Sequence, residues 1–238
     1  MNAIGIIPAR LAASRFPGKP LASMLGMPML GHCYHRTRLA EGIKQTYVAT
    51  CDEEIARYIE GIGGQAVMTS IEHTRATTRT AEALEHIEAT TGAAVDIVVM
   101  VQGDEPLIPP AAIAETLRHF EDESVSIVNI MSRIPTLEAF EDKNNVKAVV
   151  DQNNDALYFS REPIPSPWRG WEDIPRNMQT GIIAFRRDTL VQFNAMQETE
   201  LEQIESVDMN RVLETGGQIR MVLIDGVTIG VDTADELK

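Results

Sequence analysis

Three cations lie on one short loop near the start of the chain. Arg10, Arg15 and Lys19 follow the apolar run 4–7, which predicts a short buried strand, and prolines and a glycine break regular structure after it. Such a loop presents cations and backbone N–H groups at the carboxyl end of a strand, where open α/β sheets bind nucleotides. The first forty residues contain no Asp or Glu, although the formal net charge is -14. We therefore expect this loop to bind a triphosphate; the alternative is a solvated basic loop.

Two acids follow apolar runs later in the chain. Asp104, within Gln-Gly-Asp-Glu-Pro, comes just after the run 96–101, so we expect it at the same sheet edge as the basic loop. Asp232, within Gly-Val-Asp-Thr, also follows an apolar stretch. Mg²⁺ typically takes one or two carboxylates together with phosphate oxygens and waters. The two acids therefore predict Mg²⁺ held against the triphosphate; the alternative is that each acid only caps the helix after it.

Strands and helices are expected to alternate through the first half of the chain. Short apolar runs predict strands at 4–7, 46–50, 65–68 and 96–101. Apolar residues at helical spacing, together with helix start and stop signals, predict helices at 29–39, 53–62, 79–89 and 109–120. This alternation indicates right-handed βαβ units and a mostly parallel sheet.

The pattern changes from Ser124 onward. Strand-like runs with little helix between them lie at 124–132, 146–151, 156–160 and 181–185. The polar link 151–155 predicts a hairpin turn, so we expect an antiparallel insertion. A helical pattern covers 201–213, and a final strand follows it. We expect one domain, 1–238, made of three consecutive segments, 1–123, 124–186 and 187–238.

Composition argues against several classes of protein. All 35 acidic residues lie beyond position 40, whereas nucleic-acid binding needs a broad basic surface. No apolar run reaches the ~20 residues that span a bilayer, and no signal peptide precedes the first strand. Two cysteines are too few for a disulfide framework, and no Cys/His spacing indicates zinc. We therefore expect a cytoplasmic protein with no nucleic-acid or membrane partner.

Five motifs, in order and with compatible spacing along the whole chain, resemble one family. They are I-P-A-R-L-A-A-S-R-F-P-G-K-P-L, V-Q-G-D-E-P-L-I-P, N-V-K-A-V-V-D, A-L-Y-F-S-R-E-P-I-P and G-V-D-T-A-D-E-L. The family is the CMP-Kdo synthetases, or 3-deoxy-manno-octulosonate cytidylyltransferases. The resemblance implies a Rossmann-like α/β nucleotidyltransferase: a mixed, mostly parallel sheet flanked by helices, with a small antiparallel insertion that contributes to a homodimer. It also implies transfer of CMP from CTP to a 3-deoxy-2-ulosonic acid sugar, with Mg²⁺ and release of pyrophosphate.

The resemblance assigns roles by position. It implies that residues 1–123 bind CTP, that residues 124–186 bind the acceptor, and that residues 187–238 carry the metal-ligand turn. The expected catalytic residues are Arg10, Lys19 and Asp104, and the expected metal ligands are Asp104 and Asp232. The expected nucleotide-binding residues are Ala9, Arg10, Ser14, Arg15, Lys19, Thr77, Arg79 and Gln102. The expected acceptor-binding residues are Gln102, Arg161, Gln179, Phe185, Asp208 and Met209.

The chain departs from the family pattern near both substrates. The family's H-x-S-G-T-[DE]-R appears as H-T-R-A-T-T-R at 73–79, so Arg75, Ala76 and Thr78 replace Ser, Gly and an acid, which bears on the preference for cytosine. On the acceptor side, a His, a Tyr, a Glu and a Gln of the family are replaced by Gln179, Phe185, Asp208 and Met209. A site built to hydrogen-bond hydroxyls discriminates strongly through those bonds. We therefore hypothesise an acceptor that is Kdo, a modified Kdo, or another acidic acceptor such as a different ulosonic acid or a phosphonate; the alternative is drift at these positions.

Two further interpretations remain open. One is a sugar-phosphate nucleotidyltransferase that uses UTP or dTTP, which would share a basic loop after the first strand. The other is a non-catalytic family member. Retention of Arg10, Lys19, Asp104 and Asp232 argues against the second, because such charges destabilise a protein unless something binds there.

Overall fold

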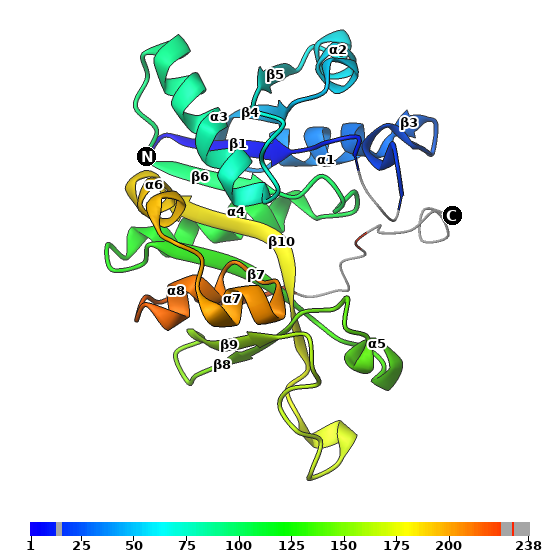
Figure 1. Cartoon of the computed structure of the whole chain (residues 1–238), viewed down its shortest axis with the longest axis vertical. Helices are drawn as coiled ribbons and strands as arrows, with labels where there is room; N and C mark the ends of the chain where they lie inside the picture. Colours follow the sequence, from blue (N-terminus) through cyan, green and yellow to red (C-terminus); the bar gives the residue numbers. More distant parts are fainter. Residues whose placement is uncertain (13–15, 225–229, 231–238) are drawn as a thin grey trace. The chain divides into compact units, whose positions relative to one another are not determined.

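The computed structural model describes residues 1–12, 16–224 and 230 (Figure 1). The chain divides into two compact units, and neither is one continuous stretch of sequence. The described residues of unit 1 are 1–12, 16–118, 181–194 and 230, and those of unit 2 are 119–180 and 195–224.

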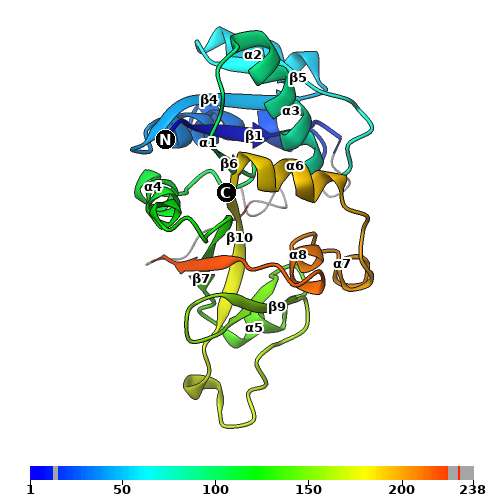
Figure 2. The ribbon, with the colours of Figure 1, turned by 90° about the vertical axis from the view of Figure 1, so that its left-hand side faces the viewer.

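Unit 1 is built on a mixed, mostly parallel sheet (Figure 2). Its strands are β1 (Ala3–Pro8), β4 (Ile43–Thr50), β5 (Gln65–Met68), β6 (Ile97–Val101) and the second half of β10 (Asn177–Arg186). They lie in the order β10-β6-β1-β4-β5; β1 is parallel to both neighbours, β4 is parallel to β5, and β10 is antiparallel to β6. All residues of β1 and β6 are buried, so these two apolar strands form the centre of the core.

Helices cover both faces of this sheet (Figure 1). They are α1 (Met29–Arg38), α2 (Glu53–Gly61), α3 (Ala76–Thr91), α4 (Pro110–Arg118) and α6 (Arg187–Ala195), with a short helix η1 (Lys19–Leu21) and a small hairpin of β2 (Ser23–Met24) and β3 (Met27–Pro28). Right-handed crossovers put α1 and α3 on opposite faces. Helix α1 packs closely on β1, because a Cβ at Gly5 would lie 2.5 Å from Thr37 Cγ2.

Unit 2 combines a parallel pair of strands with an antiparallel hairpin. Strands β7 (Ile127–Arg133) and β11 (Arg220–Leu223) are parallel, and β8 (Lys147–Val150) and β9 (Ala156–Ser160) are antiparallel. The first half of β10 joins β8 through Met178 and Lys147. The helices are η2 (His119–Glu121), α5 (Leu137–Glu141), η3 (Trp171–Asp173), α7 (Glu200–Glu205) and α8 (Asn210–Glu214).

The expected α/β class and the expected strands and helices of the first half are confirmed. The single helix expected at 201–213 is wrong: Ser206 adopts a left-handed conformation, φ 52°, and divides the segment into α7 and α8. Strand β7 is parallel to β11 on one side and pairs with β10 on the other. Helices α5 and α6 were not predicted. Within the described residues, no helix is long and apolar enough to cross a membrane.

Candidate active site

The basic loop after β1 is tied to the carboxyl edge of the unit 1 sheet. Ala9 N–H donates to Ala49 O at 2.9 Å, and Leu11 N–H donates to Asp52 Oδ2 at 2.7 Å. Gly18 N–H then donates to Leu11 O at 3.0 Å, which brings the two ends of the loop together. These bonds hold the loop at the edge where the parallel strands end, as its sequence predicts. Ser14 and Arg15 lie outside the described residues.

A cavity of about 310 Å³ lies at this edge of unit 1. It is lined by residues of the basic loop, of the segment 73–79 and of the turn after β6, including Ala9, Arg10, Lys19, Gln102 and Asp104. Lys19 Nζ lies 3.2 Å from Asp104 Oδ2, and both side chains are partly buried. The structure therefore brings the three expected catalytic residues, Arg10, Lys19 and Asp104, to one cavity.

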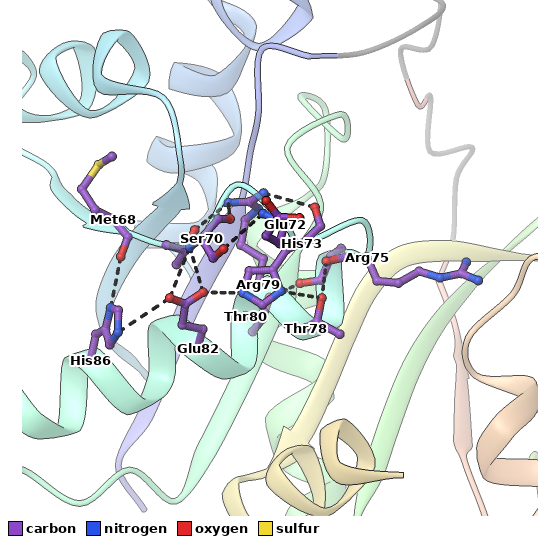
Figure 3. A network of polar contacts seen from close by, with 12 residues as sticks. Met68, Ser70, Glu72, His73, Arg75, Thr78, Arg79, Thr80, Glu82 and His86 are labelled. Carbon is purple, nitrogen blue, oxygen red and sulfur yellow. Dashed lines mark hydrogen bonds and ion pairs between the residues drawn. The ribbon is translucent and has the colours of Figure 1, made fainter. Parts of the chain in front are cut away.

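A second wall of the cavity is held by Glu82 of α3 (Figure 3). Both carboxylate oxygens of Glu82 accept the Ser70 N–H, at 2.9 and 3.2 Å, and Glu82 also pairs with His73 Nε2. His73 Nδ1 in turn lies 3.0 Å from Thr78 Oγ1. Burial acts to raise the pKa of Glu82, but the Ser70 N–H and His73 outweigh it and lower the pKa below its usual range. A charged Glu82 thus fixes the loop that carries His73 into the cavity wall.

Arg79 supports this wall from inside. Arg79 is 3% exposed, and its Nη1 donates to Thr69 Oγ1 at 2.6 Å and Ser70 O at 3.2 Å. Its Nη2 donates to His73 O at 3.4 Å. Thr77 is buried as well. The guanidinium of Arg79 lines the cavity but is committed to the loop 69–73, so its direct role in nucleotide binding stays a prediction.

Gln102 is positioned by a close approach of two backbones. Its N–H donates to Gly181 O at 2.9 Å, and Gly181 N–H donates to Glu105 Oε1 at 3.0 Å. A Cβ at Gly181 would lie 2.7 Å from Gln102 Cβ, so a larger residue would displace this side chain. Gln102 lines the cavity beside Asp104, which suits the predicted contacts with nucleotide and acceptor.

In unit 2, the guanidinium of Arg161 donates hydrogen bonds to several backbone carbonyls. Its guanidinium donates to Glu205 O at 2.6 Å, Lys143 O at 2.8 Å and Ser206 O at 3.3 Å. Its own N–H donates to Glu205 Oε2 at 2.8 Å. Arg161 therefore fixes the turn between α7 and α8, and its predicted contact with the acceptor remains a prediction.

Lys147 has a similar environment. It is fully buried, and its Nζ donates to Asp142 O and Asn145 O at 2.8 Å and to Arg161 O at 2.6 Å. Burial lowers the pKa of Lys147, and the nearby carboxylates oppose this only in part. A cation without solvent, bound by three carbonyls, has a structural role.

The remaining acceptor residues have different environments. Phe185 has no exposed surface and packs against Phe193 in the core of unit 1, with ring centroids 6.4 Å apart. Met209 is also fully buried, in unit 2. Neither side chain has a surface to offer an acceptor, so both predicted contacts are corrected to core positions. Gln179 Nε2 donates to Asn129 Oδ1 at 2.7 Å, and Gln179 and Asp208 both stay partly accessible.

The described residues supply one carboxylate for a metal at the cavity. Among these residues, no group of three or more His, Cys, Asp or Glu side chains is placed to hold a metal ion. Asp104 lines the cavity and is partly exposed. A Cβ at Gly230 would lie 4.0 Å from Asp104 O. Asp232, two residues later, lies outside the described residues.

Two positioning residues were missed by the sequence reasoning. Asp52 follows β4 and binds Leu11 N–H, so the rule that picked Asp104, an acid just after a parallel strand, also applies to Asp52. Glu82 lies inside α3, where its spacing resembles that of any exposed helical acid. No sequence signal distinguishes it.

Comparisons with known proteins show the family of this chain. A family model described as cytidylyltransferase matches residues 4–223. The chain is 42% identical over 249 residues to a 3-deoxy-manno-octulosonate cytidylyltransferase of Geotalea uraniireducens (strain Rf4), covering 100% of this chain and 97% of that protein. It is also 42% identical over 248 residues to the enzyme of the same name from Geobacter metallireducens, covering 100% of this chain and 95% of the relative.

Solved structures give the same family. A CMP:2-keto-3-deoxy-manno-octonic acid synthetase complexed with CTP is 35% identical, with a TM-score of 0.88 over 99% of this chain and 95% of that one. A putative glucose-1-phosphate thymidylyltransferase of Bacillus anthracis is 16% identical, with a TM-score of 0.67 over 99% of this chain and 92% of that one, and so shares the fold alone. The chain therefore belongs to the cytidylyltransferase family, among the 3-deoxy-manno-octulosonate cytidylyltransferases.

Proposed function

We propose that this enzyme transfers CMP from CTP to 3-deoxy-manno-octulosonate (Kdo) and releases pyrophosphate. The observation that carries the proposal is the cavity that joins Arg10, Lys19 and Asp104, in a chain 42% identical to enzymes of this name. The relative solved with CTP, at 35% identity, supports CTP as the donor.

The side chains of the cavity suit nucleotidyl transfer. A sugar hydroxyl attacks the α-phosphorus of CTP and releases its proton to solvent; the new O–P bond forms as the bond from the α-phosphorus to the bridging oxygen breaks, and pyrophosphate leaves. Such transfers depend mainly on alignment and on neutralising the phosphate oxygens, with little covalent work for the protein. Arg10 and Lys19 supply positive charge for these oxygens. The Lys19–Asp104 pair keeps the ammonium in place until the nucleotide binds.

We propose Mg²⁺ as the cofactor. The oxygen-only donor set and the partly exposed Asp104 suit Mg²⁺, which accepts one or two carboxylates and fills its sphere with phosphate oxygens and water. Asp104 would hold the ion, with Asp232 as the second expected ligand. When bound, Mg²⁺ would neutralise phosphate charge and raise the acidity of the attacking hydroxyl.

Kdo is favoured over a different acceptor. The hypothesis of an altered acceptor rested on four changes, and two of them, at Phe185 and Met209, are buried side chains of the core. The relatives that match the whole chain carry the Kdo name. Uridine or thymidine triphosphate with a sugar phosphate is not favoured, because the thymidylyltransferase likeness concerns the fold alone. A non-catalytic role is not favoured either.

A homodimer in the cytoplasm completes the proposal. Unit 2 exposes large apolar side chains, among them Trp168 (91%), Ile204 (68%) and Leu157 (60%), which suit a contact with a second copy. Both cysteines, Cys33 and Cys51, are free thiols, which suits a reducing compartment.

The test is pyrophosphate release with Mg²⁺ and CTP across Kdo, 8-amino-Kdo and sialic acid. We expect turnover with Kdo, and none when UTP or dTTP replaces CTP. Asp104→Asn should lower turnover by about 100-fold or more with an unchanged melting temperature. The control is Asp173→Asn, an exposed acid of unit 2. Turnover with another acid but not with Kdo would overturn the assignment of the acceptor.

A further inference from the structure

A second cavity of unit 1, of about 320 Å³, lies away from the basic loop. The basic loop is bound at and just after the end of β4, through Ala49 and Asp52, whereas the second cavity lies at the start of that strand. Its lining comes from the end of α1, the start of β4 and the turn before β5, and includes Tyr34, Arg38, Lys44, Thr46 and Gly63. Among the described residues, it shares none with the first cavity, which holds Arg10, Lys19 and Asp104.

The phenol of Tyr34 is buried in the wall of this second cavity. Tyr34 is 2% exposed, and it belongs to the lining. Its ring reaches the turn before β5, because a Cβ at Gly64 would lie 2.9 Å from Tyr34 Cζ, the carbon that carries the hydroxyl. This hydroxyl makes no hydrogen bond within the part of the chain that the structure describes. A buried tyrosine hydroxyl usually has a partner, so a ligand in the cavity is the group that would supply it.

Thr46 repeats this pattern on β4. It also lines the second cavity, and it is 1% exposed. Its Oγ1 is buried and has no hydrogen-bond partner among the described residues. Most buried polar side-chain atoms in proteins have a partner, so each exception needs an explanation. Two such hydroxyls in the lining of one cavity indicate a site that is completed by something bound there.

The charge of the second cavity is positive. Arg38 and Lys44 are exposed, and neither forms an ion pair or a side-chain hydrogen bond in the described part of the chain. No Asp or Glu belongs to the described lining, although the formal net charge of the chain is -14. Arg38 lies in the last turn of α1, where the helix dipole favours a cation. The dipole accounts neither for Lys44 nor for the two buried hydroxyls, so we look for an anion.

We propose that the second cavity binds a phosphate group, that of inorganic phosphate or of a small phosphomonoester. A phosphate monoester carries nearly two negative charges at pH 7, which matches the two cations, whereas a carboxylate carries one. Guanidinium and ammonium groups both form strong, charge-assisted bonds with phosphate oxygens. Ligand pockets span about 300 to 1,000 Å³, so this cavity suits a small ligand. The inference goes beyond the proposed function and does not depend on it, because the two cavities have separate linings.

The test is calorimetric titration of the full chain with inorganic phosphate, with glycerol phosphate and with acetate, at constant ionic strength. We expect both phosphates to bind more tightly than acetate. Tighter binding of glycerol phosphate would identify a phosphomonoester as the ligand, and tighter binding of inorganic phosphate would identify the free ion. Arg38→Gln should weaken phosphate binding by about tenfold, because a charge-assisted bond is lost.

Tyr34→Phe tests the buried hydroxyl by itself. It should weaken phosphate binding by about threefold, the effect of one neutral hydrogen bond. Without phosphate its melting temperature should not fall, since the hydroxyl has no partner to lose. A lowered melting temperature together with unchanged phosphate binding would show that the hydroxyl serves the fold and would overturn its part in the site.

The matched control is Arg57→Gln on α2, an exposed arginine paired with Glu53, whose loss makes the same change of net charge as Arg38→Gln. It should leave phosphate binding unchanged. Lys19→Met separates the two cavities, and phosphate should still bind to this variant. Loss of all phosphate binding in Lys19→Met, with no change in Arg38→Gln, would place phosphate in the first cavity and overturn the inference. Equal affinity for acetate, or no binding of phosphate by the unaltered protein, would also overturn it.

Discussion

Two lysines, one in each unit, bind different kinds of partner. In unit 1, Lys19 lies on a cavity wall and pairs with the side-chain carboxylate of Asp104. In unit 2, Lys147 is fully buried and donates to three backbone carbonyls. Both lysines belong to motifs of the same family resemblance, so the sequence presents them alike.

The partner explains the difference in role. Backbone carbonyls are held in place by the fold and cannot move away when a ligand binds. A cation bound by several of them is therefore a fixed element of the fold. A carboxylate on a side chain can exchange its cation for a phosphate or a metal ion when a ligand binds. The comparison between Lys19 and Lys147 therefore separates a cation that we predict to be functional from a structural one, and it extends to Arg161.

The largest effect is expected for Lys19→Met. Removing a cation from the phosphate site should lower turnover with CTP and Kdo by about 1,000-fold, because that charge stabilises the transition state. The free energy of unfolding should change by less than about 1 kcal/mol, since partly exposed ion pairs contribute little. Steady-state pyrophosphate release and urea denaturation measure the two quantities. A loss of stability without a loss of turnover would show that Lys19 has a structural role, as Lys147 has, and would contradict the prediction.

Lys147→Met should show the reverse pattern. The change leaves three carbonyls without their donor in a buried place, so we expect a loss of about 3 kcal/mol of unfolding free energy. At a temperature where the variant stays folded, its turnover should remain within about threefold of the original. Lys44→Met, at an exposed lysine of unit 1, is the control for chemical denaturation.

Arg161→Met tests whether this arginine has a structural role, like Lys147, or a functional role, like that predicted for Lys19. Loss of its bonds to Lys143, Glu205 and Ser206 should lower the unfolding free energy by about 2 kcal/mol. The control is Arg169→Met, an exposed arginine of the same unit. A raised KM for Kdo with unchanged stability would instead show that Arg161 binds the acceptor as the family resemblance implies.

Glu205 gives unit 2 a dependence on pH. Burial acts to raise the pKa of Glu205, but the Arg161 N–H and the hydroxyls of Ser160 and Tyr158 outweigh it and lower the pKa. A lowered pKa in the folded state means stability that is present above the unfolded-state value and is lost as the pH falls through the folded-state value. Glu205→Gln should therefore be less stable than the original by about 1 kcal/mol at pH 7 and should lose this deficit as the pH falls through the lowered, folded-state pKa of Glu205. Denaturation across pH 3–7 measures it; a deficit that is constant with pH would contradict it.

The smallest effect is expected for Glu82→Gln in unit 1. The loop 69–73 loses the charge that binds Ser70 and His73, so the cavity wall is less well fixed. We expect the KM for CTP to rise about fivefold with kcat changed less than about twofold. Glu85→Gln, at an exposed acid of the same helix, is the control. Equal changes in both variants would remove Glu82 from a positioning role.

The features predicted best from the sequence are the strands that are marked by a local run of apolar residues. Strands β1 and β6 are entirely buried and entirely apolar or small, so their runs were unambiguous. The break between α7 and α8 was missed because no Gly or Pro marks it; Ser206 is held in a left-handed turn by Arg161, a contact across 45 residues. Phe185 and Met209 were assigned to the acceptor site because a motif position does not tell which face of an element is buried.

Unit 1 is interrupted in sequence by unit 2, and this bears on how the chain folds as it is synthesised. Strand β6 pairs with β10 through contacts such as Val101 with Ile182, so one edge of a fully apolar strand stays open until the insertion has been translated. Long-range pairings of this kind form late, and an open apolar edge is prone to association with other chains. A ribosome that stalls within residues 119–180 would therefore expose unit 1 with a sheet that is one strand short.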